Sequence, residues 1–333
     1  MSAGIKAIEY YLPEKVLTNQ ELSEIFGDWT PEKILEKTGI ENRHITKNDE
    51  CVSDIAVKSC EKLFESGVIK PEEIDFIILA TQTPDYILPT TACIVQDRLG
   101  IPQSSGAIDF NLGCSAFIYG LAISKSLINT KIAKNILLIT AETYSKHIHP
   151  LDKSTRTIFG DAAAVALISE GGHSIGEFDL GTDGSGFDKL IIPAGGSRIP
   201  KSDDTGIEKE DSGSIRSQEN IYMSGTDIFN FTIKVVPQTI NNILQKHNLV
   251  MDDIDLFVFH QANKFMLDFL RKKVKIPEDR FVIDMKDTGN TVSPTIPIVL
   301  KRAEENGRLK KGDKVLIIGF GVGLSWGSTI IDW

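Results

Sequence analysis

The sequence of 333 residues is poor in cysteine, lacks a long hydrophobic run and carries no excess of basic charge. Its four cysteines, Cys51, Cys60, Cys93 and Cys114, include no closely spaced pair. That absence argues against a disulfide framework or a zinc site and favours a reducing compartment. A membrane span needs roughly 18 consecutive apolar residues, and no segment approaches that length. The first residues also lack a secretory signal pattern, so we expect a cytoplasmic protein without a membrane span or a metal.

The overall charge is acidic, with a net value of −10 at pH 7. General binding to nucleic acids is therefore not expected, and any anionic ligand would need a local basic patch. A hydrophobic content of 41% and a charged content of 25% are typical of a globular protein with a sizeable core. The length fits one large domain or two halves of ordinary size.

Three pairs of segments resemble each other at a nearly constant offset of roughly 180 residues, which indicates an internal repeat. The paired segments are residues 71–82 with 251–261, residues 107–110 with 282–285, and residues 135–141 with 314–320. We interpret the chain as two diverged halves, residues 1–170 and residues 171–333. Each half alternates strands and helices, which favours a mixed α/β sheet.

Cys114 stands at a predicted corner between a strand and a helix. Residues 107–110 form an apolar, strand-like run, Gly113 permits a tight turn, and an apolar helix is predicted over residues 115–128. A thiol at this place faces the positive end of the helix, so we expect its pKa to be lowered. A helix that is apolar on nearly every side is usually buried. We therefore expect a deep site that is reached through a tunnel.

His260 and Asn290 each follow an apolar strand-like run, and α/β sheets place their chemistry at such strand ends. A thiolate is a nucleophile suited to acyl groups. An imidazole can donate or accept a proton near neutral pH, and a carboxamide supplies a directed N–H donor. Two such donors aimed at one oxygen would stabilise an enolate. The glycine-rich turn at Gly319–Gly323 is able to form a second anion hole.

Simpler interpretations apply to most of these residue types. A lone cysteine is usually an inert buried residue, which is our expectation for Cys51, Cys60 and Cys93. The other histidines are expected to be structural, and Gly289-Asn290 alone would be interpreted as a turn. The polar segment 195–220 is predicted to be a long surface excursion whose charges are solvated.

With these residues in place, the chain resembles the ketoacyl-ACP synthase III family of the thiolase superfamily nearly end to end. The resemblance rests on Asn111–Phe117, His260–Asn263, Gly289–Thr291 and Gly319–Ser328, and further on residues 38–44, 83–92 and 158–164. It implies a five-layer α/β/α/β/α thiolase fold and a homodimer. It also implies that no cofactor is needed beyond the thioester substrates.

The resemblance implies a condensing reaction in two stages. A primer, acyl-CoA or acyl-ACP, acylates Cys114. His260 and Asn290 then promote the decarboxylation of malonyl-ACP, and the carbanion attacks the acyl-cysteine to give β-ketoacyl-ACP. The acyl oxyanion is expected to be held by the N–H of Cys114 and by an N–H of the turn at Val322 and Gly323.

Further positions correspond to substrate and partner contacts of the family. The positions that match substrate contacts are Lys33, Lys37, Leu88, Lys153, Phe229, Asn263 and Phe320. By this resemblance Phe229 lines the pantetheine tunnel, and Leu88 reaches into the partner subunit's acyl pocket. The basic residues expected to dock an acidic acyl carrier protein are Lys264, Arg271 and Lys272.

Several positions depart from the family pattern. Well-studied members clamp the adenine of CoA between a Trp and an Arg, with another Arg nearby, whereas this chain has Lys33, Lys153 and Lys37. Lysine can meet a phosphate but cannot stack as a planar group does, so we expect weak binding of CoA. Phe265 replaces a docking Arg, and Leu88 replaces a Phe, which would admit a longer or branched primer.

Other functions fit parts of the same pattern. One alternative is a same-fold acyltransferase or a head-to-head condensing enzyme of a specialised pathway. A papain-like cysteine hydrolase has the same order of Cys, His and Asn, but the sequence around Cys114 lacks that family's local motif. A non-enzymatic scaffold would not need Cys114, His260 and Asn290 together.

Overall fold

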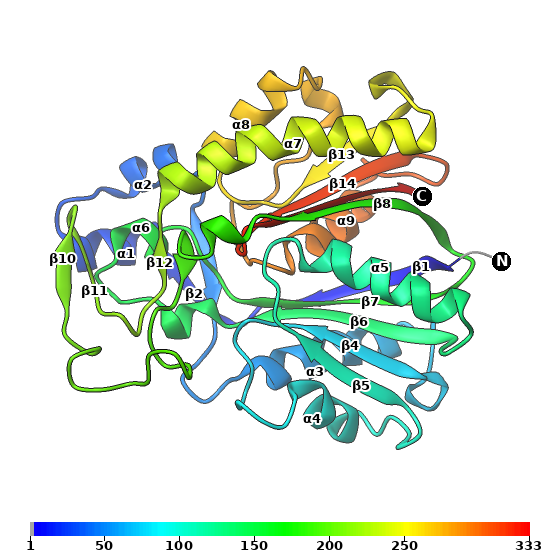
Figure 1. The fold of residues 1–333 in the computed structure, drawn as a ribbon, viewed down its shortest axis with the longest axis horizontal. Helices are drawn as coiled ribbons and strands as arrows, with labels where there is room; N and C mark the ends of the chain where they lie inside the picture. The colour runs from blue at the N-terminus through cyan, green and yellow to red at the C-terminus, as the bar shows by residue number, and fades with distance from the viewer. Residues whose placement is uncertain (1–2) are drawn as a thin grey trace.

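The protein, a computed structural model that describes residues 3–333, is organised around one mixed sheet of nine strands (Figure 1). The strand order is β13-β14-β15-β8-β1-β7-β6-β4-β5. In chain order these strands are β1 (Ala3–Tyr11), β4 (Phe76–Ala80), β5 (Gly106–Phe110), β6 (Asn135–Glu142), β7 (Ala162–Glu170), β8 (His173–Thr182), β13 (Leu256–Phe259), β14 (Lys314–Gly321) and β15 (Ser325–Asp332).

The strand order repeats on the two sides of the junction between β1 and β8. Outward from that junction, β7, β6 and β4 on one side correspond to β15, β14 and β13 on the other. The pairings agree as well: β6–β7 and β14–β15 are antiparallel, whereas β4–β6 and β13–β14 are parallel. Only Gly4 with Ser174 and Ile5 with His173 join β1 to β8, so the two wings of the sheet diverge from this edge. The division into residues 1–170 and 171–333 remains an interpretation.

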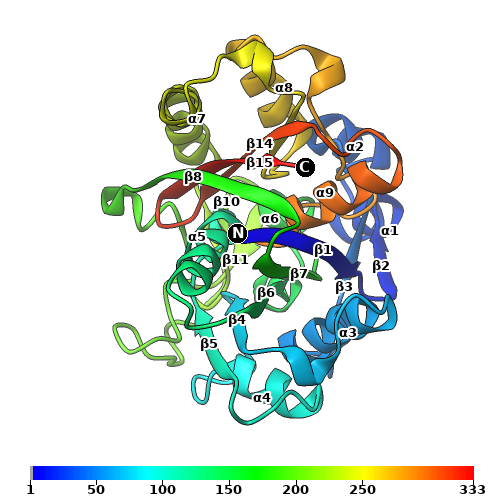
Figure 2. The same ribbon diagram turned by 90° about the vertical axis from the view of Figure 1, so that its right-hand side faces the viewer.

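Helices cover the wings and fill the space between them, which gives five layers (Figures 1 and 2). Two helices, α5 (Ala116–Asn129) and α9 (Thr295–Glu305), lie between the wings. The outer face of the β8-β15-β14 wing is covered by α7 (Gly225–His247) and α8 (Lys264–Lys273), and the outer face of the other wing by α3 (Val52–Glu65) and α4 (Thr91–Arg98). The α/β/α/β/α thiolase fold expected from the sequence is confirmed.

The remaining elements are short and lie mostly beyond one end of the sheet. The helices are α1 (Asn19–Phe26), α2 (Pro31–Thr38) and α6 (Lys153–Arg156). Three two-stranded ribbons pair β2 (Lys15–Thr18) with β3 (Asn42–Ile45), β9 (Leu190–Ile191) with β12 (Tyr222–Met223), and β10 (Lys209–Asp211) with β11 (Ser214–Arg216). Single 3₁₀ turns are formed by Pro71–Glu73, Tyr144–His147, Gly184–Gly186, Met251–Asp253 and Glu278–Arg280.

The helix predicted after Cys114 is present as α5 and is buried, as its composition requires. Phe117, Ile118 and Leu121 are fully buried and belong to one apolar cluster with strands of both wings. Gly120 lets α5 approach β6, because a Cβ at this position would lie 2.4 Å from a methyl group of Leu138. A fully apolar helix is stable only where neighbours cover all its sides, and the space between two sheets provides such cover.

The repeat is incomplete at residues 282–285, which the sequence pairs with the strand β5. No strand forms there: Phe281, just before it, makes an isolated bridge with Phe257, and the N–H of Val282 donates to the carbonyl of Phe257. The side chain of Gln261 supplies the missing hydrogen bonds: its Nε2 donates to the carbonyls of Phe259 and Val282, and its Oε1 accepts from the N–H of Asp284. The side chain of Gln261 therefore makes hydrogen bonds that a neighbouring strand would otherwise make. A comparison of apolar sequence segments does not reveal this substitution.

The segment 195–220 is a surface excursion, as predicted, but its charges are not all solvated. Arg216 pairs with the fully buried carboxylate of Asp152 at 3.4 Å and with Asp211 at 2.7 Å. The backbone N–H of Ile215 donates to the carbonyl of Leu151. These contacts attach the excursion to the region of α6. Within residues 3–333, no helix combines the length and the apolarity that a membrane crossing would require.

Candidate active site

Cys114 lies in the turn between β5 and α5, with only 4% of its surface exposed. The end of β14 passes directly beside it. A Cβ added to Gly319 would lie 2.7 Å from the carbonyl oxygen of Cys114, and one added to Gly321 would lie 3.0 Å from its sulfur. Glycine is therefore required at both positions if the second half is to reach the nucleophile of the first.

A cavity of about 240 Å³ brings together the three residues that the sequence singles out. Cys114, His260 and Asn290 all line it, although they come from the first half, the end of β13 and the loop before α9. The other lining residues are mainly apolar and include Ile158, Phe159, Leu190, Ile228, Met266 and Phe320. This is the deep, mostly apolar site that a buried helix after the nucleophile predicts.

His260 is fixed from behind. Its Nδ1 lies 2.8 Å from Oγ1 of Thr295 at the start of α9, and its ring lies nearly perpendicular to that of Phe320, with centroids 5.7 Å apart. Burial lowers the pKa of His260 to about 3, against a smaller opposite effect of a hydrogen bond with the Val292 backbone. The imidazole is thus neutral at physiological pH.

Asn290 has its carboxamide oriented by the backbone. Its Oδ1 accepts the N–H of Val292 at 2.9 Å, and its main chain bonds to Ile158 and Gly160 on the opposite loop. Within residues 3–333 the Nδ2 group makes no hydrogen bond with another residue, so it is available as a donor in the cavity. The amide therefore presents N–H groups, which suit an oxyanion or an enolate.

The expectation of a lowered pKa for Cys114 is wrong. Burial raises the pKa of the Cys114 thiol, and the nearby carboxylate of Glu142 adds to the rise. The backbone N–H groups of Cys114 and Val322 hydrogen-bond to the sulfur and oppose both effects without cancelling them. The positive end of α5 stabilises the thiolate too little to offset the cost of removing it from water. The local sequence pattern does not specify this burial.

The backbone around the sulfur has the geometry of an anion-binding turn. Val322 and Cys114 both direct N–H groups at it, and Ser325 secures the turn by donating from Oγ to the carbonyl of Val322 at 2.7 Å. Gly323 follows with a φ of 134°, which glycine adopts far more readily than other residues. The use of Cys114, Val322 and Gly323 as an oxyanion hole remains a prediction.

Comparison with known proteins identifies the family. Models of 3-oxoacyl-[acyl-carrier-protein (ACP)] synthase III match residues 108–184, and models of its C-terminal part match residues 244–333. The chain is 40% identical over its full length to the β-ketoacyl-[acyl-carrier-protein] synthase III of Caldanaerobacter subterraneus, covering 98% of that protein. It is 38% identical to the synthase of Fusobacterium nucleatum, again over its full length and covering 99% of that protein.

Solved structures agree with this assignment. A crystal structure of a 3-oxoacyl-(acyl-carrier-protein) synthase III matches with a TM-score of 0.98 and 48% identity, covering 100% of both chains. The chain belongs to the 3-oxoacyl-[acyl-carrier-protein] synthase III family. The condensing, acyltransferase-type function expected from the sequence is confirmed at the level of this family.

Two of the seven positions matched to substrate contacts of synthase III enzymes line the cavity, Asn263 and Phe320. Phe229 does not line it. Its ring packs against Phe265 and Phe269, with centroids 5.9 and 5.0 Å away. These three rings form an aromatic surface patch on α7 and α8, next to cavity-lining residues such as Ile228 and Met266. A role of Phe229 in a tunnel remains a prediction.

The lysines at the positions of the adenine clamp surround an aromatic pair that sequence reasoning missed. The ammonium groups of Lys33 and Lys37 lie 5.0 and 5.4 Å from the ring centroid of Trp29. Lys153 lies over Phe26 at 5.9 Å and pairs with Asp28 at 2.6 Å. Trp29 lies before the N-cap Thr30 of α2 and so outside the helix, which means that helical spacing gave no signal for its contact with the two lysines.

The predicted carrier-docking residues are largely paired within the chain. Lys264 bonds to Asp268 at 2.5 Å, and Arg271 pairs with Glu278 at 3.4 Å. Lys272 makes no ion pair within residues 3–333, and Phe265 beside them is exposed. Basic charge is therefore partly neutralised on α8, and an aromatic patch adjoins it. Docking at Lys264, Arg271 and Lys272 remains a prediction.

Leu88 lies at the tip of an exposed apolar loop. It is 79% exposed and the preceding Ile87 is 96% exposed, which is unusual for neighbouring large apolar residues in a monomer. A second cavity of about 370 Å³ is lined by Gln82 and Val322, which lie beside Gly113 of the Cys114 corner. Its lining includes Gln82, Tyr144, Phe187, Val322 and Gly323.

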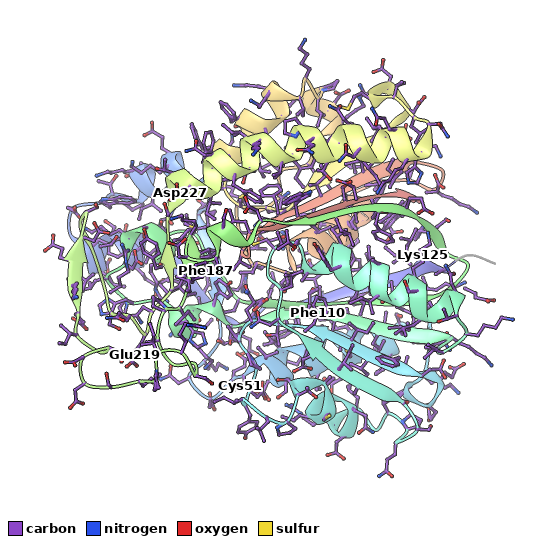
Figure 3. The ribbon with its side chains drawn as sticks, viewed as in Figure 1. Cys51, Phe110, Lys125, Phe187, Glu219 and Asp227 are labelled. Carbon is purple, nitrogen blue, oxygen red and sulfur yellow. The ribbon has the colours of Figure 1, made fainter. Side chains whose placement is uncertain are left out.

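Leu190 lines both cavities, and the rings of Tyr144 and Phe159 meet between them with centroids 5.1 Å apart. Figure 3 shows Phe187 on the same side of the molecule as Glu219 of the long excursion, whereas Phe110 at the end of β5 lies nearer the middle. Lys125, by contrast, lies toward the far end of α5. The second cavity is lined by Gln82 and Asn111, which follow β4 and β5, and by Ile221, which follows the excursion.

Three further residues at the site carry no motif that sequence reasoning recognised: Glu142, Val292 and Thr295. Burial raises the pKa of Glu142 to about 8, while hydrogen bonds from Gln82, Ser293 and Thr83 oppose the rise. Val292 is a buried β-branched residue with a φ of 63°, a rare conformation for such a side chain. No group of three His, Cys, Asp or Glu side chains within residues 3–333 is arranged to hold a metal ion.

Proposed function

We propose that this synthase III family member loads an acyl primer on Cys114 and condenses it with a malonyl thioester of an acyl carrier protein. The observation that carries the proposal is the single cavity that Cys114, His260 and Asn290 line together. In it, a buried thiol faces an imidazole and an amide that offer N–H donors. Few other reactions need a nucleophile and two neutral donors in one apolar site.

In the first stage, the thiol of Cys114 attacks the thioester carbon of the primer. The thiol proton leaves with the departing CoA or carrier thiolate, so the exchange is balanced. The N–H groups of Cys114 and Val322, which already point at the sulfur, are placed to stabilise the oxyanion of this step. Because the pKa of Cys114 is raised, the thiol is protonated before the reaction, and its proton is transferred to the thiolate that leaves.

In the second stage, the malonyl carboxylate leaves as CO₂. The resulting enolate oxygen accepts hydrogen bonds from Nε2–H of His260 and Nδ2–H of Asn290. The enolate carbon attacks the acyl carbon, and the thiolate of Cys114 departs and takes up a proton from solvent. Because the imidazole is neutral at physiological pH, it acts here as a hydrogen-bond donor and not as a charged group.

The acyl chain on Cys114 needs a binding site separate from the one that the incoming malonyl thioester occupies. The second cavity offers that place, because Val322 and Leu190 line it. Leu88 of the partner subunit would close this cavity in a homodimer. The exposure of Ile87 and Leu88 and of Ile108 on the edge strand β5 supports such an interface.

The donor of the primer is either CoA or a carrier protein. Weak binding of CoA was expected because Lys33 cannot stack on adenine, but Trp29 supplies an aromatic face beside Lys33 and Lys37. A cluster of three lysines with an aromatic ring suits the phosphates and the base of a nucleotide. We therefore propose acyl-CoA as a competent donor, with the carrier thioester as the condensing partner in the cytoplasm.

The test is intact-mass spectrometry after incubation with a panel of acyl-CoA and acyl-ACP thioesters. A mass increase equal to the acyl group, absent from a Cys114→Ala variant and unchanged in Cys93→Ala, would support the assignment. Product analysis with malonyl-ACP should then show β-ketoacyl-ACP and CO₂. Formation of an ester without CO₂ would instead favour an acyltransferase on the same fold.

A further inference from the structure

One part of the wall of the second cavity, the place proposed above for the acyl chain, is polar. Gln82, Asn111 and Tyr144 line it, and most of the other lining residues are apolar. No charged side chain of residues 3–333 lines this cavity. A wall that only has to hold a hydrocarbon chain needs no such groups, because a polar group that is covered without a partner costs free energy.

The carboxamide of Gln82 is held beside the corner that carries the nucleophile. A Cβ added to Gly113, the residue before Cys114, would lie 2.4 Å from Oε1 of Gln82. The backbone N–H of Gln82 donates to Oε2 of Glu142 at 3.0 Å and fixes the main chain there. Because Gly113 and Cys114 are adjacent, the amide of Gln82 lies near the place where an acyl chain on the sulfur begins.

Tyr144 orients this amide. Its hydroxyl donates to Oε1 of Gln82 and has no other acceptor in the described part of the chain. Burial raises the pKa of Tyr144, and the neighbouring Glu142 and Cys114 add to the rise, so the phenol keeps its proton. The carbonyl end of the amide therefore faces Tyr144, and its NH₂ end faces Asn111, whose Oδ1 accepts from Nε2 at 3.2 Å.

Several N–H groups of this polar wall have no acceptor. An amide nitrogen carries two N–H groups, and Nε2 of Gln82 donates only one of them, to Asn111. The other has no partner among the described residues, and neither has the NH₂ group of Asn111. Both amide oxygens, by contrast, already accept a hydrogen bond. The group that this wall lacks is therefore an oxygen acceptor, which a ligand can supply.

We propose that the second cavity selects a primer whose acyl chain carries a neutral oxygen, a hydroxyl or a carbonyl, within its first few carbons, and that Gln82 and Asn111 recognise this oxygen. A carboxylate is disfavoured, because no cationic side chain of the described residues lines the wall. A purely apolar chain would leave the N–H groups unpaired once the cavity is closed. The inference rests on the proposed function, because it needs an acyl chain on Cys114.

The test uses pairs of primers that differ only where one of them carries an oxygen. In 3-hydroxybutyryl-CoA a hydroxyl stands where isovaleryl-CoA has a methyl group, so the two have nearly the same shape. Each pair is offered in equal amounts, and the peptide that contains Cys114 is then analysed by mass spectrometry. Acetoacetyl-CoA against isovaleryl-CoA tests a carbonyl, and 4-hydroxybutyryl-CoA against pentanoyl-CoA tests a more distant hydroxyl. We expect the oxygen-bearing adduct to exceed its apolar counterpart by roughly 10-fold in at least one pair.

Gln82→Met keeps the length of the side chain and removes the amide. It should lower the ratio of the two adducts several-fold, because methionine covers an apolar chain without an unpaired N–H. Asn111→Leu, at an exposed position, should lower the same ratio. Gln238→Met, on the exposed face of α7, is the matched control and should keep it. A variant that folds poorly loses both adducts together, so the ratio remains informative.

Three outcomes would overturn the inference. One is that the apolar primer gives the larger adduct in every pair. Another is an unchanged ratio in both Gln82→Met and Asn111→Leu, and the third is that succinyl-CoA, which carries a carboxylate, exceeds all the neutral primers. In each of these cases Cys114 is acylated, so the proposed function stands. If no thioester acylates Cys114, the proposed function fails and this inference fails with it.

Discussion

Gly321 lies so close to Cys114 that a Cβ on it would be 2.9 Å from Cβ and 3.0 Å from Sγ of the cysteine. The strand that ends at Gly321 belongs to the second half of the chain, and the cysteine belongs to the first. Contact between two segments about 200 residues apart in the sequence therefore fixes the position of the nucleophile.

Gly321→Ala should displace the sulfur, since the neighbouring atoms on both sides are buried. A misplacement of about 1 Å at a reacting group can reduce the rate roughly 100-fold. We expect the rate of acyl-enzyme formation to fall at least 10-fold, with little loss of fold. Gly196→Ala, in open space on the surface excursion, is the matched control. Equal rates for the two alanine variants would show that the close contact is unimportant.

Alanine at His260 or Asn290 should separate the two stages of the reaction. Both side chains act on the malonyl group in the proposed mechanism, so Cys114 should still acquire the acyl mass. Condensation should fall by roughly 100- to 1,000-fold, the usual effect of removing one donor. Mass spectrometry follows the first stage and CO₂ release the second. If neither variant becomes acylated, this assignment of roles is wrong.

Trp29→Ala should weaken the use of acyl-CoA. The indole contacts the ammonium groups of Lys33 and Lys37, and it offers the aromatic surface missing at position 33. We expect KM for acyl-CoA to rise several-fold with kcat unchanged, and Trp29→Phe to have a smaller effect. Acyl-ACP as donor serves as the control because it lacks the nucleotide. An unchanged KM for acyl-CoA would place nucleotide binding elsewhere.

Glu142 should make the protein less stable as the pH rises. Burial raises the pKa of Glu142 to about 8, whereas the unfolded chain releases this proton near pH 4.3. Between these values the folded state binds the extra proton, so its free energy of unfolding falls with rising pH, by at most about 1.4 kcal/mol per pH unit for one group. The effect is absent below both pKa values and constant above both.

Glu142→Gln removes the titration and keeps the size of the side chain. The difference in unfolding free energy between the unmodified protein and this variant should therefore fall steadily from about pH 5 to pH 8. Denaturant unfolding at several pH values measures it. Parallel curves over this range would mean that Glu142 ionises normally.

The sequence alone determined much of this protein. Cys114, His260 and Asn290 could be picked out because each follows a strand-like run, and the end of a strand is a local feature. The buried helix α5 followed from its composition, and the motifs around Gly113 and Gly319 pointed to the family. These signals are local, so they can be recognised in the sequence without a structure.

Only the tertiary structure decided the protonation of the site's residues and the hydrogen bonds that orient them. The raised pKa of Cys114, the hydrogen bond from Val292 to Asn290 and the contact of Thr295 with His260 all depend on burial and on distances between distant segments. Trp29 beside Lys33 is another such case. Desolvation acts through everything that surrounds a group in three dimensions, and a single chain of letters does not state which residues surround it.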